Sequence, residues 1–167
     1  MTFTQQIDSD SYRMIKKITN VDQARRIIAV TYFQAQDVDY FSSIIIRKIK
    51  FSIHCSKQCR KTNDGIVLLK LPQQFSSCTQ VALIEEIIKV KNEIFLAVQL
   101  LETRGKLKLT LDSHEVLCPF VYVGSINPLQ DLLFLPASCI IEKMSSYYDK
   151  ANQYYYYLQY PNLTEST

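Results

Sequence analysis

An all-β fold is predicted by three features of the sequence. Tyrosine and phenylalanine are abundant, with 11 and 8 copies in 167 residues, and aromatic residues fit a pleated, half-buried surface. Short apolar stretches follow one another with polar turns between them, and no regular helices separate them as in a βαβ sheet. Closure into a barrel would leave such strands without exposed edges. The predicted fold is therefore an antiparallel β-barrel with a short N-terminal helix and an amphipathic C-terminal helix.

Size and composition indicate one soluble domain. The chain is 47% hydrophobic and 21% charged, and its three glycines exclude a glycine-rich phosphate loop. The opening residues, MTFTQQIDSDSYR, lack the basic and apolar regions of a secretory signal, and no apolar run is long enough to span a membrane. Five cysteines, an odd number, then favour reduced thiols in the cytosol or nucleus.

The N-terminal part predicts a flexible arm, a helix and two strands. Residues 1–8 form the arm, and a serine at position 9 or 11 caps a helix that runs to about Ile18. Residues 24–35 are rich in β-branched and aromatic side chains and predict the first strand. Residues 43–54 predict the second strand, because apolar and polar residues alternate strictly from Ile49.

The central part predicts further strands joined by short turns. A hairpin around Lys91-Asn92-Glu93 joins two apolar segments, although the first of them, residues 81–90, also fits a helical period. Arg104-Gly105 predicts a turn before the alternating strand 106–111. The other predicted strands, each an apolar stretch bounded by turn residues or proline, are 66–71, 118–124 and 132–141.

The tyrosine-rich segment 143–160 favours a helix, with a hairpin turning at residues 149–152 as the alternative. One helical stripe would hold Met144, Tyr148, Ala151, Tyr155 and Leu158. The hairpin stays open because tyrosine prefers strands. So many rings cannot all pack on one small barrel, and tyrosine is enriched at interfaces, so the segment predicts partner binding or folding back onto its own barrel. The candidate partner-binding residues are Met144, Tyr147, Tyr148, Ala151, Tyr155 and Leu158.

A basic stretch at residues 47–61 is the strongest local chemical signal, because it contains no acidic residue. On a strand and the following loop, its cations would track phosphates. The alternative is a solvated face with lysines that protect a sheet edge, and the net charge of +3 is too small to decide. The candidate nucleic-acid-binding residues are Lys48, Lys50, Lys57, Arg60 and Lys61. The candidate base-stacking rings are Tyr32, Phe33, Tyr40 and Phe41.

Catalytic and metal chemistry have weak support. Residues 112–115, Asp-Ser-His-Glu, have the residue types of a hydrolytic triad, but neighbours on one loop rarely form one. Cys55 and Cys59 are the single close-spaced cysteine pair, whereas a structural zinc site usually needs two pairs. The sequence therefore predicts a protein that is not an enzyme and that has no metal or cofactor.

A resemblance in plan follows from LFLPASCIIE (133–142), a strand that runs into the predicted helix 143–160. This ending resembles the smallest subunit of the telomeric CST complex, which is similar in plan to the smallest subunit of replication protein A. The resemblance implies an OB-like barrel over residues 9–142, a partner-binding helix over 143–160 and a tail over 161–167. It also implies a larger OB-fold partner and weak or complex-mediated binding of single-stranded DNA. The implied setting is nuclear, at telomeres, with telomerase or polymerase alpha–primase, as for a ciliate telomerase-associated protein.

A second resemblance rests on Cys118-Pro119-Phe120-Val121-Tyr122 and the following tyrosine-rich end. This pattern is similar to C-terminal β-domains of some transposon-encoded proteins. It implies a transposon-derived or chromatin-associated interaction module, and in that case the tail forms the hairpin.

Overall fold

The computed structural model describes residues 12–54, 65–72 and 78–158. These ranges hold one α-helix, α1 (Gln23–Phe33), and one short 3-10 helix, η3 (Ala137–Cys139). The strands are β1 (Tyr12–Ile18), β2 (Val38–Ile46), β3 (Ile49–Ser52), β4 (Ile66–Lys70), β5 (Thr79–Val90), β6 (Glu93–Leu111), β7 (His114–Ile126), β8 (Leu133–Pro136), β9 (Ile140–Lys143), β10 (Ser146–Asp149) and β11 (Tyr154–Leu158). In this part of the chain, no helix is long and apolar enough to cross a membrane.

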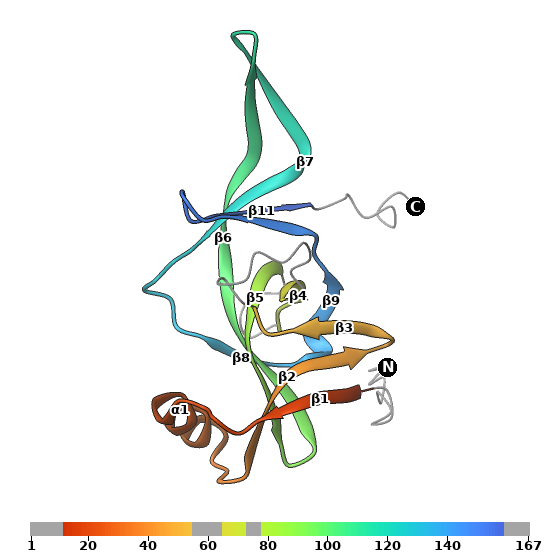
Figure 1. The fold of residues 1–167 in the computed structure, drawn as a ribbon, viewed down its shortest axis with the longest axis vertical. Coiled ribbons are helices and arrows are strands. Elements are labelled where there is room, and N and C mark those ends of the chain that lie inside the picture. Colours follow the sequence, from red (N-terminus) through yellow and green to blue (C-terminus); the bar gives the residue numbers. More distant parts are fainter. Residues whose placement is uncertain (1–11, 55–64, 73–77, 159–167) are drawn as a thin grey trace.

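The strands form one antiparallel sheet, which confirms the all-β prediction (Figure 1). The main path of pairing is β1-β2-β5-β6-β7-β11-β10. In addition, β3 pairs with β2, β4 pairs with β5 and β9, and β8 pairs with β6. The path of pairing ends at β1 and β10, so the sheet is not closed. The described strands therefore do not form a closed barrel.

The first helix and the first strand are exchanged relative to the sequence prediction. Residues 12–18, predicted as a helix, form β1, which is held in the sheet by pairing with β2. Residues 24–35, predicted as a strand, mostly form α1. The side chains of Ala29, Val30 and Phe33 pack on one cluster, and this spacing lies on one face of a helix but on opposite faces of a strand.

The predicted hairpin between residues 81–90 and the following segment is confirmed. β5 and β6 are joined by the two-residue turn Lys91-Asn92, with positive φ angles of 47° and 67°, as a tight hairpin turn requires. The predicted strand 66–71 is confirmed as β4. The predicted strand 43–54 is divided into β2 and β3 by a second turn at Arg47 and Lys48, where φ is 49° and 69°.

The predicted turn at Arg104-Gly105 is wrong, because β6 continues through it to Leu111. Gly105 adopts φ 127°, which glycine alone adopts easily, and the register with β7 shifts beside it. β6 and β7 therefore extend beyond the rest of the sheet as a projecting hairpin, which stands at the top of Figure 1. We call residues 106–121 the arm, and this name does not refer to the predicted N-terminal arm over residues 1–8.

The predicted C-terminal helix over residues 143–160 is wrong, and the hairpin left open as the alternative is found. β10 and β11 pair with each other across the turn that follows Asp149, and β11 also pairs with β7. The physical reason is burial on alternate positions: Tyr155 and Tyr157 face a core, while Tyr154 and Tyr156 are less buried. The predicted flexible arm, residues 1–8, and the predicted tail, residues 161–167, lie outside the described residues.

Three apolar clusters hold the fold together. The largest lies between β2, β3, β4, β5, β6 and β8 and is centred on side chains such as Ile44, Ile87 and Leu96. A second cluster joins β4 and β5 to the C-terminal hairpin through Met144, Tyr155 and Tyr157. The third packs α1 against β2, β5 and β6. The C-terminal hairpin is therefore part of the core.

Candidate nucleic-acid interface

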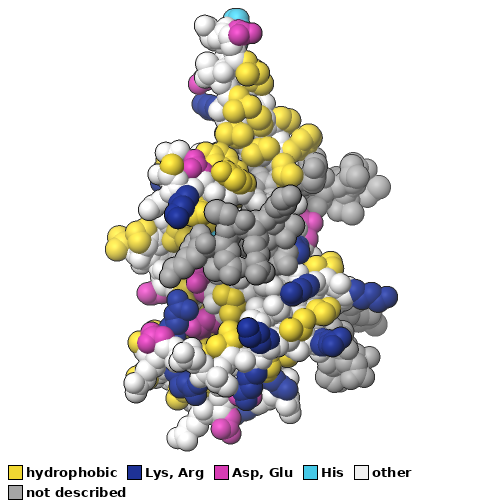
Figure 2. Space-filling view, in the orientation of Figure 1, with side chains coloured by type: hydrophobic (Ala, Val, Ile, Leu, Met, Phe, Trp, Pro, Cys, Tyr) yellow, Lys and Arg dark blue, Asp and Glu magenta, His cyan; other side chains and the backbone are white. Residues whose placement is uncertain are grey.

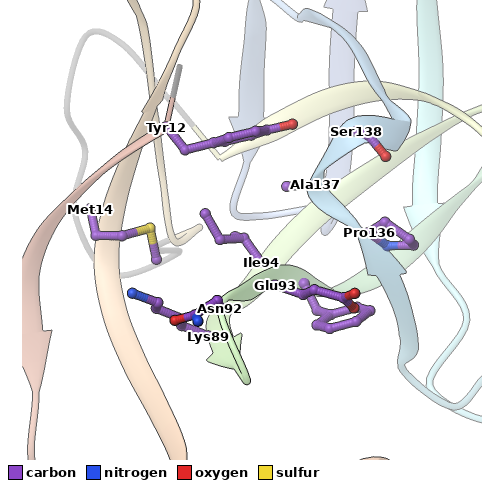
Figure 3. A pocket seen from close by; sticks show the side chains of 10 residues that line it. Tyr12, Met14, Lys89, Asn92, Glu93, Ile94, Pro136, Ala137 and Ser138 are labelled. Atoms are coloured by element: carbon purple, nitrogen blue, oxygen red, sulfur yellow. The ribbon is translucent and has the colours of Figure 1, made fainter. Parts of the chain in front are cut away.

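An open pocket of about 830 Å³ lies where the largest apolar cluster meets the surface (Figure 3). Its walls come from three segments that are far apart in sequence: the start of β1, the β5–β6 turn, and the corner formed by β8 and η3. The lining residues are Tyr12, Met14, Lys89, Asn92, Glu93, Ile94, Phe95, Pro136, Ala137 and Ser138. We call this site the β1–η3 pocket.

Tyr12 forms one wall of the pocket. In Figure 3 its ring extends from β1 across the pocket, with the hydroxyl towards the side of Ser138, and Ile94 lies between this ring and the opposite wall. Burial raises the pKa of the Tyr12 hydroxyl, and the charge of Arg47 opposes that rise. Arg47 acts on Tyr12 because Tyr12 pairs with Ile46, immediately before the turn that contains Arg47.

Lys89 lies in the opposite wall because of its position in β5. Ile87 points into the largest apolar cluster, and residues two apart in a strand share a face. Lys89 therefore points to the same side as Ile87, at the end of the strand where the cluster opens to solvent. Asn92 and Glu93 follow in the adjacent turn and at the start of β6, and they add an amide and a carboxylate.

The sheet of β1, β2 and β3 beside this pocket carries positive charge. Arg13 pairs with Ile45, and Ile45 pairs with Lys50, so both cations lie in one row across three strands, on the face opposite to Tyr12 and Met14. Arg47 and Lys48 occupy the adjoining turn and are exposed. Figure 2 shows Lys and Arg side chains over the lower part of the visible face, where these strands lie in Figure 1.

Two of the five sequence-predicted nucleic-acid residues lie in the described part of the chain, and neither lines the pocket. Lys48 and Lys50 are exposed on the β2–β3 hairpin, next to the strand that carries Tyr12. Lys57, Arg60 and Lys61 lie outside the described residues.

The predicted base-stacking rings do not gather at the pocket. Tyr40 is buried, and Arg26 lies 5.8 Å from the centre of its ring. Phe33 packs against Phe95 and Phe134 with ring centroids 4.6 Å and 5.3 Å apart. Tyr12 is not among the sequence-predicted site residues, because the pattern of residues 12–18 favours a helix. Lys89 is not among them either, although the alternation from Ile87 indicates its place on the same face of β5.

The predicted partner-binding stripe is dispersed by the hairpin. Met144 and Tyr155 are buried in the second cluster, where the Tyr155 hydroxyl lies 3.1 Å from Nε2 of His54. Burial raises the pKa of Tyr155 well above its ordinary value. Tyr148 packs beside Tyr155 with ring centroids 4.5 Å apart. Tyr147 is 68% exposed, whereas Ala151 lies in the turn.

Leu158 is the last described residue of the chain and is half-buried opposite Val121. With Met144 and Tyr155 in the core, the predicted stripe does not form one accessible surface.

Metal-binding and triad residues are placed as follows. Cys55 and Cys59 lie outside the described residues. Over residues 12–54, 65–72 and 78–158, no group of three or more His, Cys, Asp or Glu side chains is arranged to hold a metal ion.

The triad-like residues 112–115 form the exposed tip of the arm, where Asp112 and Ser113 have positive φ angles of 48° and 69°. Asp112 and Ser113 therefore form the tight hairpin turn between β6 and β7.

Comparison with known proteins gives no relative: no family model, no curated protein and no solved structure matches the chain.

Proposed function

We propose that the chain is a non-catalytic subunit that binds single-stranded nucleic acid in the β1–η3 pocket and acts within a larger protein assembly. The observation that carries the proposal is the Tyr12 ring in the wall of an open pocket, with Lys89 opposite and Arg47 beside it. Proteins that bind single strands combine aromatic rings, on which bases stack, with cations that follow the phosphates. Both elements meet in this pocket.

The dimensions and charge of the pocket favour this ligand over an apolar molecule. Its volume lies within the range of about 300–1,000 Å³ that is typical of small-ligand sites. Positive charge comes from Lys89 in the wall and from Arg47, which acts on Tyr12, and Glu93 is the acidic residue in the wall. A base in a duplex is stacked inside the helix, so a ring such as Tyr12 selects unpaired bases.

The test measures binding of a fluorescent 15-nucleotide poly-dT strand to the full chain by anisotropy, over a range of salt concentrations. Tyr12→Ala should weaken binding about 10-fold or more, because stacking on an aromatic ring contributes about 1–3 kcal/mol per base. Tyr12→Phe keeps the ring and should bind like the wild type. Lys89→Glu should weaken binding and lower the salt slope by about 1.

Matched control variants come from the C-terminal hairpin. Tyr147→Ala removes an exposed ring and Lys150→Glu reverses an exposed charge, both away from the pocket. Equal losses in these controls and in the pocket variants would contradict the proposal, because they would indicate a diffuse effect of charge and aromatic surface. A duplex of the same length that bound as tightly as the single strand would also contradict it.

The basic stretch of residues 47–61 has a supporting role in this proposal. Changing Lys48, Lys50, Arg60 and Lys61 together to Glu should weaken binding of single strands without changing sequence preference, since phosphate contacts carry no sequence information. The telomeric setting and the larger OB-fold partner stay predictions from the resemblance. The C-terminal helix that was expected to contact that partner is replaced by a hairpin.

A second candidate function is favoured by that same hairpin. The resemblance to β-domains of transposon-encoded proteins implied a C-terminal hairpin, and β10 and β11 form one. In this case the chain is a chromatin-associated interaction module. Binding to duplex DNA or nucleosomes, without a preference for single strands, would favour this second candidate.

A further inference from the structure

β1 has one edge without a partner among the described strands. It pairs with β2 alone, and the path of pairing begins with it. The β1–η3 pocket lies at this edge, because Tyr12 and Met14 of β1 line it and residues of β2 do not. The corner of β8 and η3 forms the far side of the pocket (Figure 3). The backbone N–H and C=O groups of such an edge can pair with a further strand.

The chain itself supplies a segment at this edge. Residues 1–11 directly precede β1 in the sequence and lie outside the described residues. Residues 8–11, Asp-Ser-Asp-Ser, are of the types that form turns, and four-residue loops are common in hairpins. Residues 3–7, Phe-Thr-Gln-Gln-Ile, would place Phe3, Gln5 and Ile7 on one face of a strand. The sequence before β1 therefore has the pattern of a strand followed by a hairpin turn.

We propose that residues 3–7 form a strand that pairs antiparallel with the free edge of β1 and covers the β1–η3 pocket when no nucleic acid is bound. The four-residue loop sets the register, so that Ile7 faces Tyr12 and Gln5 faces Met14. Opposite residues of an antiparallel pair point to the same side of the sheet. Ile7 and Gln5 therefore lie on the pocket side, whereas Gln6 faces Arg13 on the other side.

Apolar character and charge both favour this occupant. Ile94 and Ala137 line the pocket, and apolar side chains from residues 3–7 leave water when they pack against such groups. Residues 1–11 contain two aspartates and no lysine or arginine. Because Tyr12 pairs with Ile46, the loop of residues 8–11 lies at the same end of β1 as the turn of Arg47 and Lys48. Opposite charges therefore come together at this end of the hairpin.

The regulatory consequence of this strand rests on the proposed function. If single strands bind in the pocket, residues 3–7 compete with them, because both need the space beside Tyr12. The apparent affinity of a site that is open for part of the time is reduced by the open fraction. The N-terminal strand therefore lowers the affinity of the chain for single strands.

The first test detects the strand pairing without nucleic acid. Gln6→Cys and Arg13→Cys are introduced together in the full chain, because the proposed register places them opposite each other on the face away from the pocket. After mild oxidation, peptide mapping by mass spectrometry should find an intramolecular disulfide between the two introduced cysteines in most molecules. Gln6→Cys with Lys17→Cys is the matched control and should stay unlinked, since Lys17 lies four residues further along β1.

Three outcomes of this test would overturn the proposal. They are an unlinked first pair, equal linkage in both pairs, and disulfide-linked dimers, which would mean that a second copy supplies the strand. The melting temperature of each variant checks that the fold is intact.

The second test measures binding of the fluorescent poly-dT strand to the full chain. Phe3→Ser with Ile7→Ser should strengthen binding about 5-fold or more, because the pocket is then open for a larger fraction of the time. Thr4→Ser with Gln6→Ser changes the other face of the same segment and should bind like the wild type. Unchanged binding in the first variant, or equal strengthening in the second, would overturn the regulatory role. No binding by any of these chains would contradict the proposed function, whereas the disulfide test would still decide the pairing.

Discussion

Replacing Tyr155 by Ala tests whether the C-terminal hairpin is part of the core. The Tyr155 side chain is 2% exposed. Its ring lies 4.5 Å from the ring of Tyr148 and 5.5 Å from that of His54, and its hydroxyl lies 3.1 Å from Nε2 of His54. Truncation of a buried aromatic side chain costs about 3–5 kcal/mol of unfolding free energy, and a hydrogen bond contributes about 1 kcal/mol. We therefore expect Tyr155→Ala to destabilise the chain by about 4 kcal/mol.

The measurement is unfolding of the full chain by urea and by heat. For a chain of this size, 4 kcal/mol corresponds to a decrease of about 8–16 °C in melting temperature. Tyr155→Phe removes only the hydroxyl and should cost about 1 kcal/mol. Tyr147→Ala is the matched control, because Tyr147 is on the adjacent strand but 68% exposed, and it should change stability by less than about 0.5 kcal/mol. Equal effects of Tyr147→Ala and Tyr155→Ala would refute the packing described here.

Two further predictions concern pH and metal ions. Burial raises the pKa of Glu86 above its ordinary value of 4.5, and the charge of Arg25, whose Nη1 lies 3.7 Å from Oε1 of Glu86, opposes the rise. The folded state therefore holds this proton more tightly than the unfolded state, so the contribution of Glu86 to stability is fully present below pH 4.5 and is lost as pH rises through the raised pKa. Urea unfolding at several pH values should show this loss in the wild type and not in Glu86→Gln, and parallel pH profiles would contradict it. For metal ions, elemental analysis of the purified chain should find well under one zinc per chain, and a chelator should leave the melting temperature unchanged. Stoichiometric zinc, together with unfolding by the chelator, would mean that Cys55 and Cys59 are ligands.

Strands with local sequence signals were predictable. The β5–β6 hairpin has two long apolar segments around Lys91-Asn92, and asparagine tolerates the positive φ that a tight turn requires. β4 is a short apolar run that ends before Pro72. In both cases the local propensity agrees with the tertiary environment.

Elements that depend on distant partners were not predictable from local pattern. Residues 12–18 become a strand because β2 supplies an edge for them. Residues 23–33 become a helix, despite their β-branched and aromatic side chains, because a helical face packs against β2, β5 and β6. The segment from Met144 to Leu158 fits both periods, and pairing of β11 with β7 decides for the hairpin.

The candidate site was not predictable from the basic stretch. Lys48 and Lys50, which that stretch indicates, are exposed on the β2–β3 hairpin and do not line the pocket. The pocket itself joins β1 to the β5–β6 turn and η3, which are separated by tens of residues in the sequence. Tyr12 becomes part of it through the pairing of β1, so no local pattern could have placed its ring opposite Lys89.

The most direct test of the proposed function is a titration of the isotope-labelled full chain with an unlabelled six-nucleotide poly-dT strand, followed by ¹⁵N–¹H correlation spectra. We expect the largest shift changes in the amides of residues 12–14, 89–95 and 137–138, the segments that contain the lining residues of the β1–η3 pocket. Residues of the C-terminal hairpin, 146–158, should change least. Saturable shifts confined to the pocket segments, and their loss in Tyr12→Ala, would support the account. Shift changes centred on another surface, or none at millimolar oligonucleotide, would contradict it.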